Sequence, residues 1–328
     1  MYYSTSCLSN RYKFSKILDI YNGWSIKNVE LGVCNEPDID LNILKNYDFN
    51  YIVHHYFPPP KNPFIINLAS QNEQILNKSV FQIIKSIDFC TDFGINLFSF
   101  HAGFRIDPDL KFKFAPDPDN IPDYETSFNT FKESVLEIVD YAERSGVKVA
   151  IENNVIQEHN LERGFSALDI YVPTSFKGLT GCPWYTGPFK AEPTTFLSCS
   201  DVCCATRSFG MVGGSQPDLS GGNSLDGQNK LLLMCELWEF ERLFNEIRSD
   251  NLGILLDLGH LKINSNILNF DADEFISRLR DKTFAVHLHE NNGRVDQHRC
   301  TKEGNWVLDM VDKYFKDNDV PCILECKC

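Results

Sequence analysis

One pattern recurs along this chain: an amphipathic helix, a glycine, a short apolar strand, and then a histidine or an acid. In "VFQIIKSIDFCTDFGINLFSFH", apolar residues recur at helical spacing up to Gly94, and an apolar run then ends at His101. A glycine directly after such a helix is a common C-terminal cap, so each unit predicts a helix followed by a strand. Strands that alternate with helices form parallel sheets, because each helix carries the chain back across the sheet.

Eight strand candidates follow this pattern or a weaker version of it. They lie in residues 2–8, 28–34, 49–55, 95–101, 147–153, 254–260, 283–289 and 321–325. Eight strand–helix units in about 250 residues, insertions aside, predict a closed (β/α)8 TIM barrel. A doubly wound open sheet is the alternative, which is disfavoured because no glycine-rich phosphate loop follows the first strand.

Two segments depart from the repeat. Residues 164–229 are rich in Gly, Ser, Thr, Pro and Cys, whereas their flanks are rich in Ile, Asn, Lys and Phe. We expect an irregular or disordered insertion after strand five, so that residues 1–163 and 230–328 form a single barrel domain. The chain stops three residues after Glu325, which predicts a missing or truncated last helix. A partner that covers strand eight, and hence an oligomer, is compatible with this layout.

Charge and composition limit the class of partner. The net charge of −14 disfavours nucleic acid, whose phosphates a negative field repels. No run of 18 apolar residues is present and the N-terminal stretch lacks the layout of a signal peptide, so we expect a cytoplasmic protein without a membrane span. In that compartment the 12 cysteines are expected to be reduced.

Most histidines and several acids stand at or just beyond the ends of the predicted strands. These residues are His54, His55, His101, Glu152, Asp257, His260, His287, His289, Asp296, His298 and Glu325. The carboxyl ends of barrel strands converge on one mouth, so these side chains should face one another. Taken singly, such a histidine is more often a hydrogen-bonded wall residue, and such an aspartate is more often a helix N-cap.

Several carboxylates at one mouth would repel one another unless a cation lay among them. Mixed histidine and carboxylate ligands indicate Zn, Mn, Fe or Co as the divalent metal, with positions left open for water or substrate. Successive side chains of a strand point to opposite sides, so only one of His54 and His55 can face the mouth, and we expect His54. The sequence therefore predicts a divalent-metal site.

Four strand ends resemble the ligand signatures of the xylose isomerase-like TIM barrel superfamily. The segments are "AIEN", "LLDLGH", "AVHLH" and "ILE", and "IINLAS" and "FSFHAG" are also similar to segments of that superfamily. "HHYFPPPKNPFIINLAS" and "RVDQH" resemble a bacterial group described as sugar phosphate isomerase/epimerase-like. The superfamily includes sugar isomerases and epimerases and the endonuclease IV group. The resemblance covers the chain except residues 164–229 and the absent last helix.

The resemblance implies a metal-dependent isomerase or epimerase that acts on a sugar or sugar phosphate. One divalent ion would be held by Glu152, Asp257, His287 and Glu325. Glu152 and Glu325 would flank the substrate, one removing a proton beside a carbonyl and the other returning it through an enediolate. The other implied contacts with substrate are His260, as a catalytic partner of a hydroxyl, and His54, His101 and Arg294.

The same resemblance implies an alternative, a multi-zinc phosphodiester hydrolase of the endonuclease IV kind that acts on abasic DNA. Further ions would then use His54, His101, His260, Asp296 and His298. The net charge and the lack of basic loops disfavour DNA, so we expect a small carbohydrate as the partner. A barrel that only binds a ligand is disfavoured, because it would not need both candidate proton-transfer acids.

Overall fold

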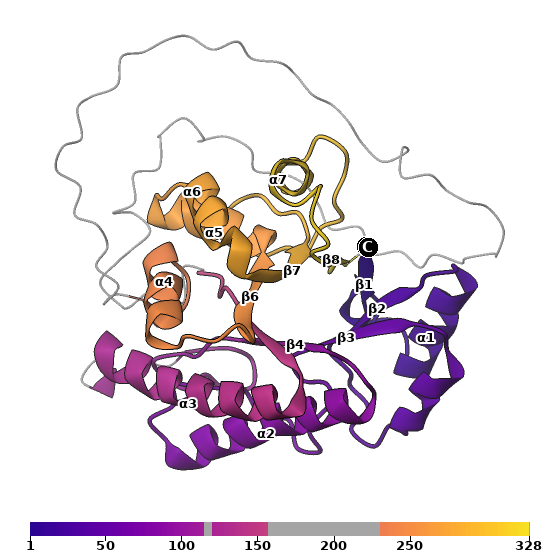
Figure 1. The fold of residues 1–328 in the computed structure, drawn as a ribbon, viewed down its shortest axis with the longest axis horizontal. Helices are drawn as coiled ribbons and strands as arrows, with labels where there is room; N and C mark the ends of the chain where they lie inside the picture. The colour runs from indigo at the N-terminus through magenta and orange to yellow at the C-terminus, as the bar shows by residue number, and fades with distance from the viewer. Residues whose placement is uncertain (115–119, 157–229, 328) are drawn as a thin grey trace, which may run out of the picture. The chain divides into compact units, whose positions relative to one another are not determined.

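The computed structural model describes residues 1–114, 120–156 and 230–327. Eight parallel strands in these ranges close into a barrel in chain order, which confirms the predicted (β/α)8 fold (Figure 1). The strands are β1 (Tyr2–Ser4), β2 (Asn28–Leu31), β3 (Asn50–His54), β4 (Leu97–His101), β5 (Lys148–Glu152), β6 (Leu252–Asp257), β7 (Thr283–Leu288) and β8 (Cys322–Leu324). Pairing of β8 with β1 closes the barrel, so each of these strands is paired on both sides.

Helices cover the outside of the barrel. They are α1 (Phe14–Gly23), α2 (Glu73–Asp92), α3 (Tyr124–Ser145), α4 (Leu237–Glu246), α5 (Leu258–Leu268), α6 (Ala272–Leu279) and α7 (Trp306–Tyr314). The 3-10 helices η1 (Thr5–Cys7), η2 (Leu41–Asn46) and η6 (Arg280–Lys282) contribute to the connections, and η2 takes the place of an α-helix between β2 and β3. Residues 325–327, the described residues after β8, form no helix. None of the described helices is long and apolar enough to cross a membrane.

The local sequence determines where α3 begins and ends. Asp123 caps its first turn by accepting the Thr126 N–H at 2.6 Å. Gly146 ends the helix with a φ of 68°, a left-handed conformation that glycine adopts without steric strain. The face that carries Phe128 and Phe131 is fully buried, and each such side chain contributes about 1.5–3 kcal/mol. Figure 1 shows α2 and α3 side by side on the outside of the barrel.

The interior of the barrel is layered by the alternation of side chains along each strand. An apolar floor consists of Ile52, Leu97, Ala150, Leu255, Ala285 and Ile323, all of them buried. The residue two positions further along a strand points inward again, because the side chains of a strand alternate between its two faces. Those residues are His54, Ser99, Glu152, Asp257, His287 and Glu325. The period of the strand therefore places the four predicted metal ligands in one polar layer above an apolar floor.

The structure differs from the sequence predictions at several places. Residues 258–260 belong to α5 rather than to a strand, because Asp257 caps that helix by accepting the His260 N–H at 2.7 Å. Residues 5–7 likewise form η1 instead of extending β1. Cys300 is disulfide-bonded, so the expectation that every cysteine is reduced is wrong. The predicted insertion, residues 164–229, lies outside the described residues.

Candidate metal centre

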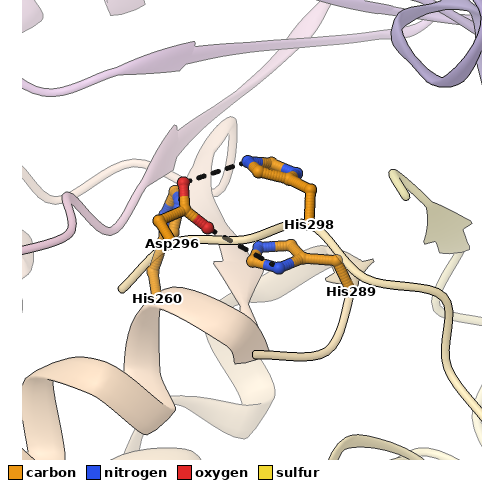
Figure 2. A group of neighbouring side chains, drawn as sticks. All are labelled: His260, His289, Asp296 and His298. Atoms are coloured by element: carbon orange, nitrogen blue, oxygen red, sulfur yellow. Dashed lines mark hydrogen bonds and ion pairs between the residues drawn. The ribbon is translucent and has the colours of Figure 1, made fainter. Parts of the chain in front are cut away.

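The mouth of the barrel brings together all of the predicted site residues except Arg294. They form overlapping groups whose ligand atoms lie within 4.8 Å of one another. We call three sets of these residues the central group (Glu152, Asp257, His287 and Glu325), the β3–β4 group (His54, His101 and Glu152) and the outer group (His260, His289, Asp296 and His298; Figure 2). In the central group, Asp257, His287 and Glu325 lie within that distance of one another, and Glu152 joins them through its contact with His287 Nδ1. Glu152 belongs to the first two, so these groups are continuous.

The central group crowds three carboxylates around one imidazole nitrogen. His287 Nδ1 lies 3.5 Å from Glu152 Oε1, 3.7 Å from Asp257 Oδ2 and 3.3 Å from Glu325 Oε2. Glu152, Asp257 and His287 are almost completely buried, whereas the Glu325 side chain is 15% exposed. Charges of one sign at such separations repel strongly in a medium of low dielectric constant. The arrangement therefore needs positive charge at its middle.

Hydrogen bonds fix which nitrogen of the buried histidines carries the proton. His287 Nε2 donates to Glu30 Oε2 at 2.8 Å, and His260 Nδ1 donates to the Asn153 carbonyl at 2.9 Å. His298 Nδ1 donates to the Glu325 carbonyl at 2.9 Å. Carbonyl and ionised carboxylate oxygens only accept, so each histidine is the donor in these pairs. The other nitrogen of each ring points to the centre. It offers a lone pair to a divalent ion when the ring is neutral, and without an ion the raised pKa values of these histidines place a second proton on it.

His54 follows the same rule in the β3–β4 group. Ser99 Oγ donates to the Val53 carbonyl at 3.4 Å, so it accepts from His54 Nδ1 at 3.0 Å. The lone pair on His54 Nε2 then faces Glu152 Oε2 at 3.3 Å, and His101 Nδ1 lies 3.1 Å from the same oxygen. His54 rather than His55 faces the carboxylate; His55 Nδ1 accepts the backbone N–H of His101 at 3.3 Å.

Several of these buried atoms have no hydrogen-bond partner within the described part of the chain. They are Glu152 Oε2, His287 Nδ1, His289 Nδ1 and Asp296 Oδ1. A buried polar atom without a partner is costly, by about 1–3 kcal/mol each, and it usually marks an ion, a water or a functional site. Imidazole nitrogens and carboxylate oxygens are the donors that Zn, Mn, Fe and Co accept. The residues present therefore fit a divalent metal.

The pKa shifts report the same concentration of negative charge. Burial lowers the pKa of His287, but the carboxylates of Glu30 and Glu325 outweigh this effect and raise it well above 6.5. Burial also lowers the pKa of His298, but the hydrogen bond to Asp296 and the charge of Glu325 raise it to about 9. Burial lowers the pKa of His54 to about 4, which keeps that ring neutral and able to ligate. Burial raises the pKa of Glu325.

Two site residues were missed from the sequence, and one predicted residue lies elsewhere. Glu30, fully buried on β2, orients His287, and its signal was an acid inside an apolar strand. His289 stands at the end of a predicted strand but was given no role. It lies two positions after His287 and should therefore point to the same side of the strand. Arg294 is exposed on the loop after β7 and is not among the residues that line the cavity described next.

The centre opens into a cavity of about 260 Å³. Its polar lining residues are His101, Glu152, Asn154, His260, Asp296, His298 and Glu325. Its apolar lining residues are Phe104, Phe112, Phe114, Val155 and Leu232. This volume lies just below the range of roughly 300–1,000 Å³ that is typical of pockets for drug-sized molecules. The lining therefore offers both hydrogen-bonding groups and apolar surface to a small molecule.

The fold and this centre define a family. The chain belongs to the xylose isomerase-like TIM barrel family, whose model matches residues 41–168 and 224–327. Among solved structures, a D-tagatose 3-epimerase-like protein matches with a TM-score of 0.59 over 99% of this chain and 90% of that one. Its sequence is 17% identical, so this similarity establishes the shared fold only.

Two curated relatives match over short stretches. An uncharacterized protein of Methanocaldococcus jannaschii is 41% identical over 70 residues, which cover 20% of this chain and 26% of that protein. A probable endonuclease 4 of Aquifex aeolicus is 42% identical over 41 residues, which cover 12% of this chain and 14% of that protein. The chain thus matches well under two thirds of the length of either relative.

Proposed function

We propose that this chain is a divalent-metal-dependent enzyme that isomerises or epimerises a sugar or sugar phosphate. The observation that carries the proposal is that Glu152 and Glu325, from β5 and from the end of β8, line one small cavity and approach the same nitrogen, His287 Nδ1. Two carboxylates so placed can each exchange a proton with one bound molecule. The fold shared with a D-tagatose 3-epimerase-like protein supports a sugar as that molecule.

Glu152 and Glu325 are the proposed proton-transfer groups. One carboxylate takes the proton from the carbon beside a carbonyl, and the other carboxyl group returns a proton to complete the isomerisation or epimerisation. A divalent ion held by Glu152, Asp257, His287 and Glu325 would polarise the carbonyl and stabilise the enediolate. Asp257 stays ionised in this process, because the His260 backbone N–H and the His289 ring donate to it.

The imidazoles that line the cavity have different tasks. The His101 side chain is 34% exposed, so it is placed to hydrogen-bond a substrate hydroxyl. The His260 side chain is only 6% exposed and its Nε2 faces Asp296 Oδ2 at 3.6 Å, which directs it away from that role. The aromatic wall of Phe104, Phe112 and Phe114 would pack against the apolar face of a sugar ring and exclude water.

Hydrogen exchange with solvent tests this function directly. We would incubate the metal-loaded protein in D₂O with a panel of ketoses, aldoses and their phosphates and measure deuterium on the carbon beside the carbonyl by NMR. The wild type should exchange at least one sugar, and Glu325→Gln should slow the exchange by about 10²- to 10⁴-fold. Glu303→Gln, the same change at an exposed residue, is the matched control and should exchange like the wild type. Absence of exchange across the panel would contradict the proposal.

A second candidate, hydrolysis of a phosphodiester in abasic DNA, is favoured by one observation. The β3–β4 group shares Glu152 with the central group, His260 of the outer group lies 3.4 Å from Glu152 Oε1, and both groups offer ligands for further ions. The short match to a probable endonuclease 4 supports it as well. Two or three ions can generate a nucleophile and clamp a phosphodiester. A nicking assay on abasic-site duplex decides: metal-dependent cleavage without sugar exchange would replace the first proposal by this one.

A further inference from the structure

The barrel closes where its first and last strands pair, and this seam is short. β1 and β8 have three residues each, and their register pairs are Tyr2 with Ile323 and Tyr3 with Leu324. By comparison, the pairing of β4 with β5 extends over the whole of both strands. In most barrels of this kind a helix after the last strand completes the outer ring, but the described residues after β8 form none. The closure of the barrel therefore depends on a short stretch of backbone pairing.

Two cysteine side chains meet at this seam. Cys7 ends η1, which directly follows β1, and Cys326 follows the end of β8 by two residues. Cys7 Sγ donates to the Leu324 carbonyl at 3.2 Å, and the Cys7 side chain also makes a hydrogen-bond contact with the side chain of Cys326. Both residues are thiols in the structure, Cys7 half-buried and Cys326 buried. Thiols in such contact need little movement to reach the S–S separation of a disulfide, about 2 Å.

Main-chain hydrogen bonds hold both thiols in this position. The Glu325 N–H donates to the Leu288 carbonyl at 3.1 Å, and the Lys327 N–H donates to the His298 carbonyl at 2.8 Å, so Cys326 lies between two anchored residues. On the other side of the seam, η1 accepts hydrogen bonds from the residues that follow β2. The contact between the two thiols is therefore part of the fold, and a bond between them loses little conformational entropy in the folded state.

We propose that Cys7 and Cys326 form a reversible disulfide that closes the β8–β1 seam covalently and holds the backbone of Glu325 in place. A disulfide stabilises a protein mainly by restricting the unfolded chain, and its effect grows with the length of the loop that it encloses. This disulfide encloses all of the chain between positions 7 and 326. The redox state of the pair thus determines how firmly the barrel is closed.

The oxidant for this step is a low-molecular-weight disulfide, such as oxidised glutathione. One thiol of the pair, as its thiolate, attacks the small disulfide and releases one glutathione thiol. The second thiol then attacks the mixed disulfide and releases the other glutathione. The pair loses two protons and two electrons in total, which leave in the two glutathione thiols, and an excess of reduced glutathione reverses both steps.

Glu325 connects this bond to the mouth of the barrel. It directly precedes Cys326, and its carboxylate Oε2 lies 3.3 Å from His287 Nδ1. Its carbonyl accepts the His298 Nδ1–H at 2.9 Å. In the oxidised protein the Glu325 backbone is held on one side by β7 and on the other by the disulfide. This effect applies to whichever reaction the central group performs.

The test compares metal-free protein after incubation with oxidised glutathione and with reduced glutathione. The remaining thiols are alkylated, and the protein is digested without reductant by trypsin and Glu-C for mass spectrometry. Cleavage after Glu325 separates Cys326 from Cys322, so a linked peptide identifies the pair without ambiguity. Thermal unfolding and amide hydrogen exchange are measured on the same samples.

We expect a peptide in which Cys7 is linked to Cys326, and a melting temperature at least about 5 °C higher in the oxidised protein. Amide exchange in residues 325–327 should slow by about 10-fold, because local opening of this segment is restricted. Reduced glutathione should return all three observations to their starting values.

Substitutions of single cysteines assign these effects. Cys7→Ser keeps a hydroxyl that can donate to the Leu324 carbonyl, and it should lose both the linked peptide and the slower exchange. Cys34→Ser, the same change at another buried thiol, is the matched control and should keep both. Cys300→Ser should also keep them, and it corrects the melting shift for the redox dependence of Cys300, which is disulfide-bonded. Cys326→Ser serves as the second variant if Cys7→Ser does not fold.

Two results would overturn the proposal. One is oxidised protein without a peptide that links the two cysteines. The other is a linked protein whose melting temperature and amide exchange equal those of the reduced form. Neither readout uses a sugar or a metal ion, so failure of the proposed activity and failure of this redox site are distinguishable.

Discussion

Glu30 decides which nitrogen of His287 is free for a metal ion. The Glu30 side chain is fully buried on β2, and its Oε2 accepts His287 Nε2–H at 2.8 Å. This bond turns His287 Nδ1, which has no other partner within the described residues, toward the three carboxylates. We predict that Glu30→Leu, which removes the acceptor at similar volume, weakens metal binding at the central group without a direct contact to the ion.

The structure sets the size of this effect. Loss of the partner that orients a ligating histidine typically lowers metal affinity by 10- to 100-fold, about 1.4–2.7 kcal/mol. In Glu30→Leu the buried His287 Nε2–H has no acceptor, which costs about 1–3 kcal/mol. The ring can avoid this cost by moving its proton to Nδ1, but the ion needs a lone pair on that nitrogen. Glu30→Gln keeps an acceptor oxygen and should lose less than about 10-fold, because only the charge is removed.

Competition with a chromophoric chelator for Zn²⁺ measures these affinities, and melting of the metal-free proteins shows whether each variant still folds. Glu36→Gln is the matched control, since Glu36 belongs to none of the metal-ligand groups and accepts the Phe14 N–H instead. The expected order of affinity is wild type and Glu36→Gln, then Glu30→Gln, then Glu30→Leu. A folded Glu30→Leu protein with wild-type affinity would refute the role of Glu30 and the tautomer assigned to His287.

Two further predictions follow from the same hydrogen bonds. Ser99→Ala removes the acceptor of His54 Nδ1–H, so metal held by the β3–β4 group should bind about 10-fold more weakly in a competition assay with a chromophoric chelator. The pKa of His298 is raised from 6.5 to about 9 in the fold, so its stabilising effect is complete below pH 6.5 and is lost as the pH rises through 9. The metal-free protein should therefore melt at lower temperature at pH 9.5 than at pH 6.5, and His298→Gln should flatten that slope.

The barrel and most of the residues at its mouth could be predicted from the sequence, because both depend on regular patterns of apolar and polar residues along each helix and strand. Alternation along a strand relates each apolar floor residue to a polar residue two positions later, as Ala150 relates to Glu152 and Ala285 to His287. Parallel strands then bring these residues to one end of the barrel. The simple reading of Asp257 as a helix N-cap also proved right, and the cap itself directs the carboxylate to the mouth.

The partners of the ligands could not be predicted, because they come from long-range contacts that no local pattern records. Glu30 and His287 are 257 residues apart, and their pairing exists only because the barrel closes. His289 looked like an ordinary strand-end histidine until Gly259 and His298 were seen to hold its ring. Arg294 had the right chemistry for an anionic substrate, but its loop turns the side chain to solvent.

The central claim is that lone pairs and carboxylates crowd at this mouth because divalent cations lie among them. Its most direct test is a Zn²⁺ titration of chelator-stripped protein, followed by elemental analysis, with Asp257→Asn in parallel. We expect the wild type to hold at least one ion per chain, in the central group, and we expect Asp257→Asn to lose that ion. A folded wild type that binds no ion below millimolar Zn²⁺ would contradict the claim.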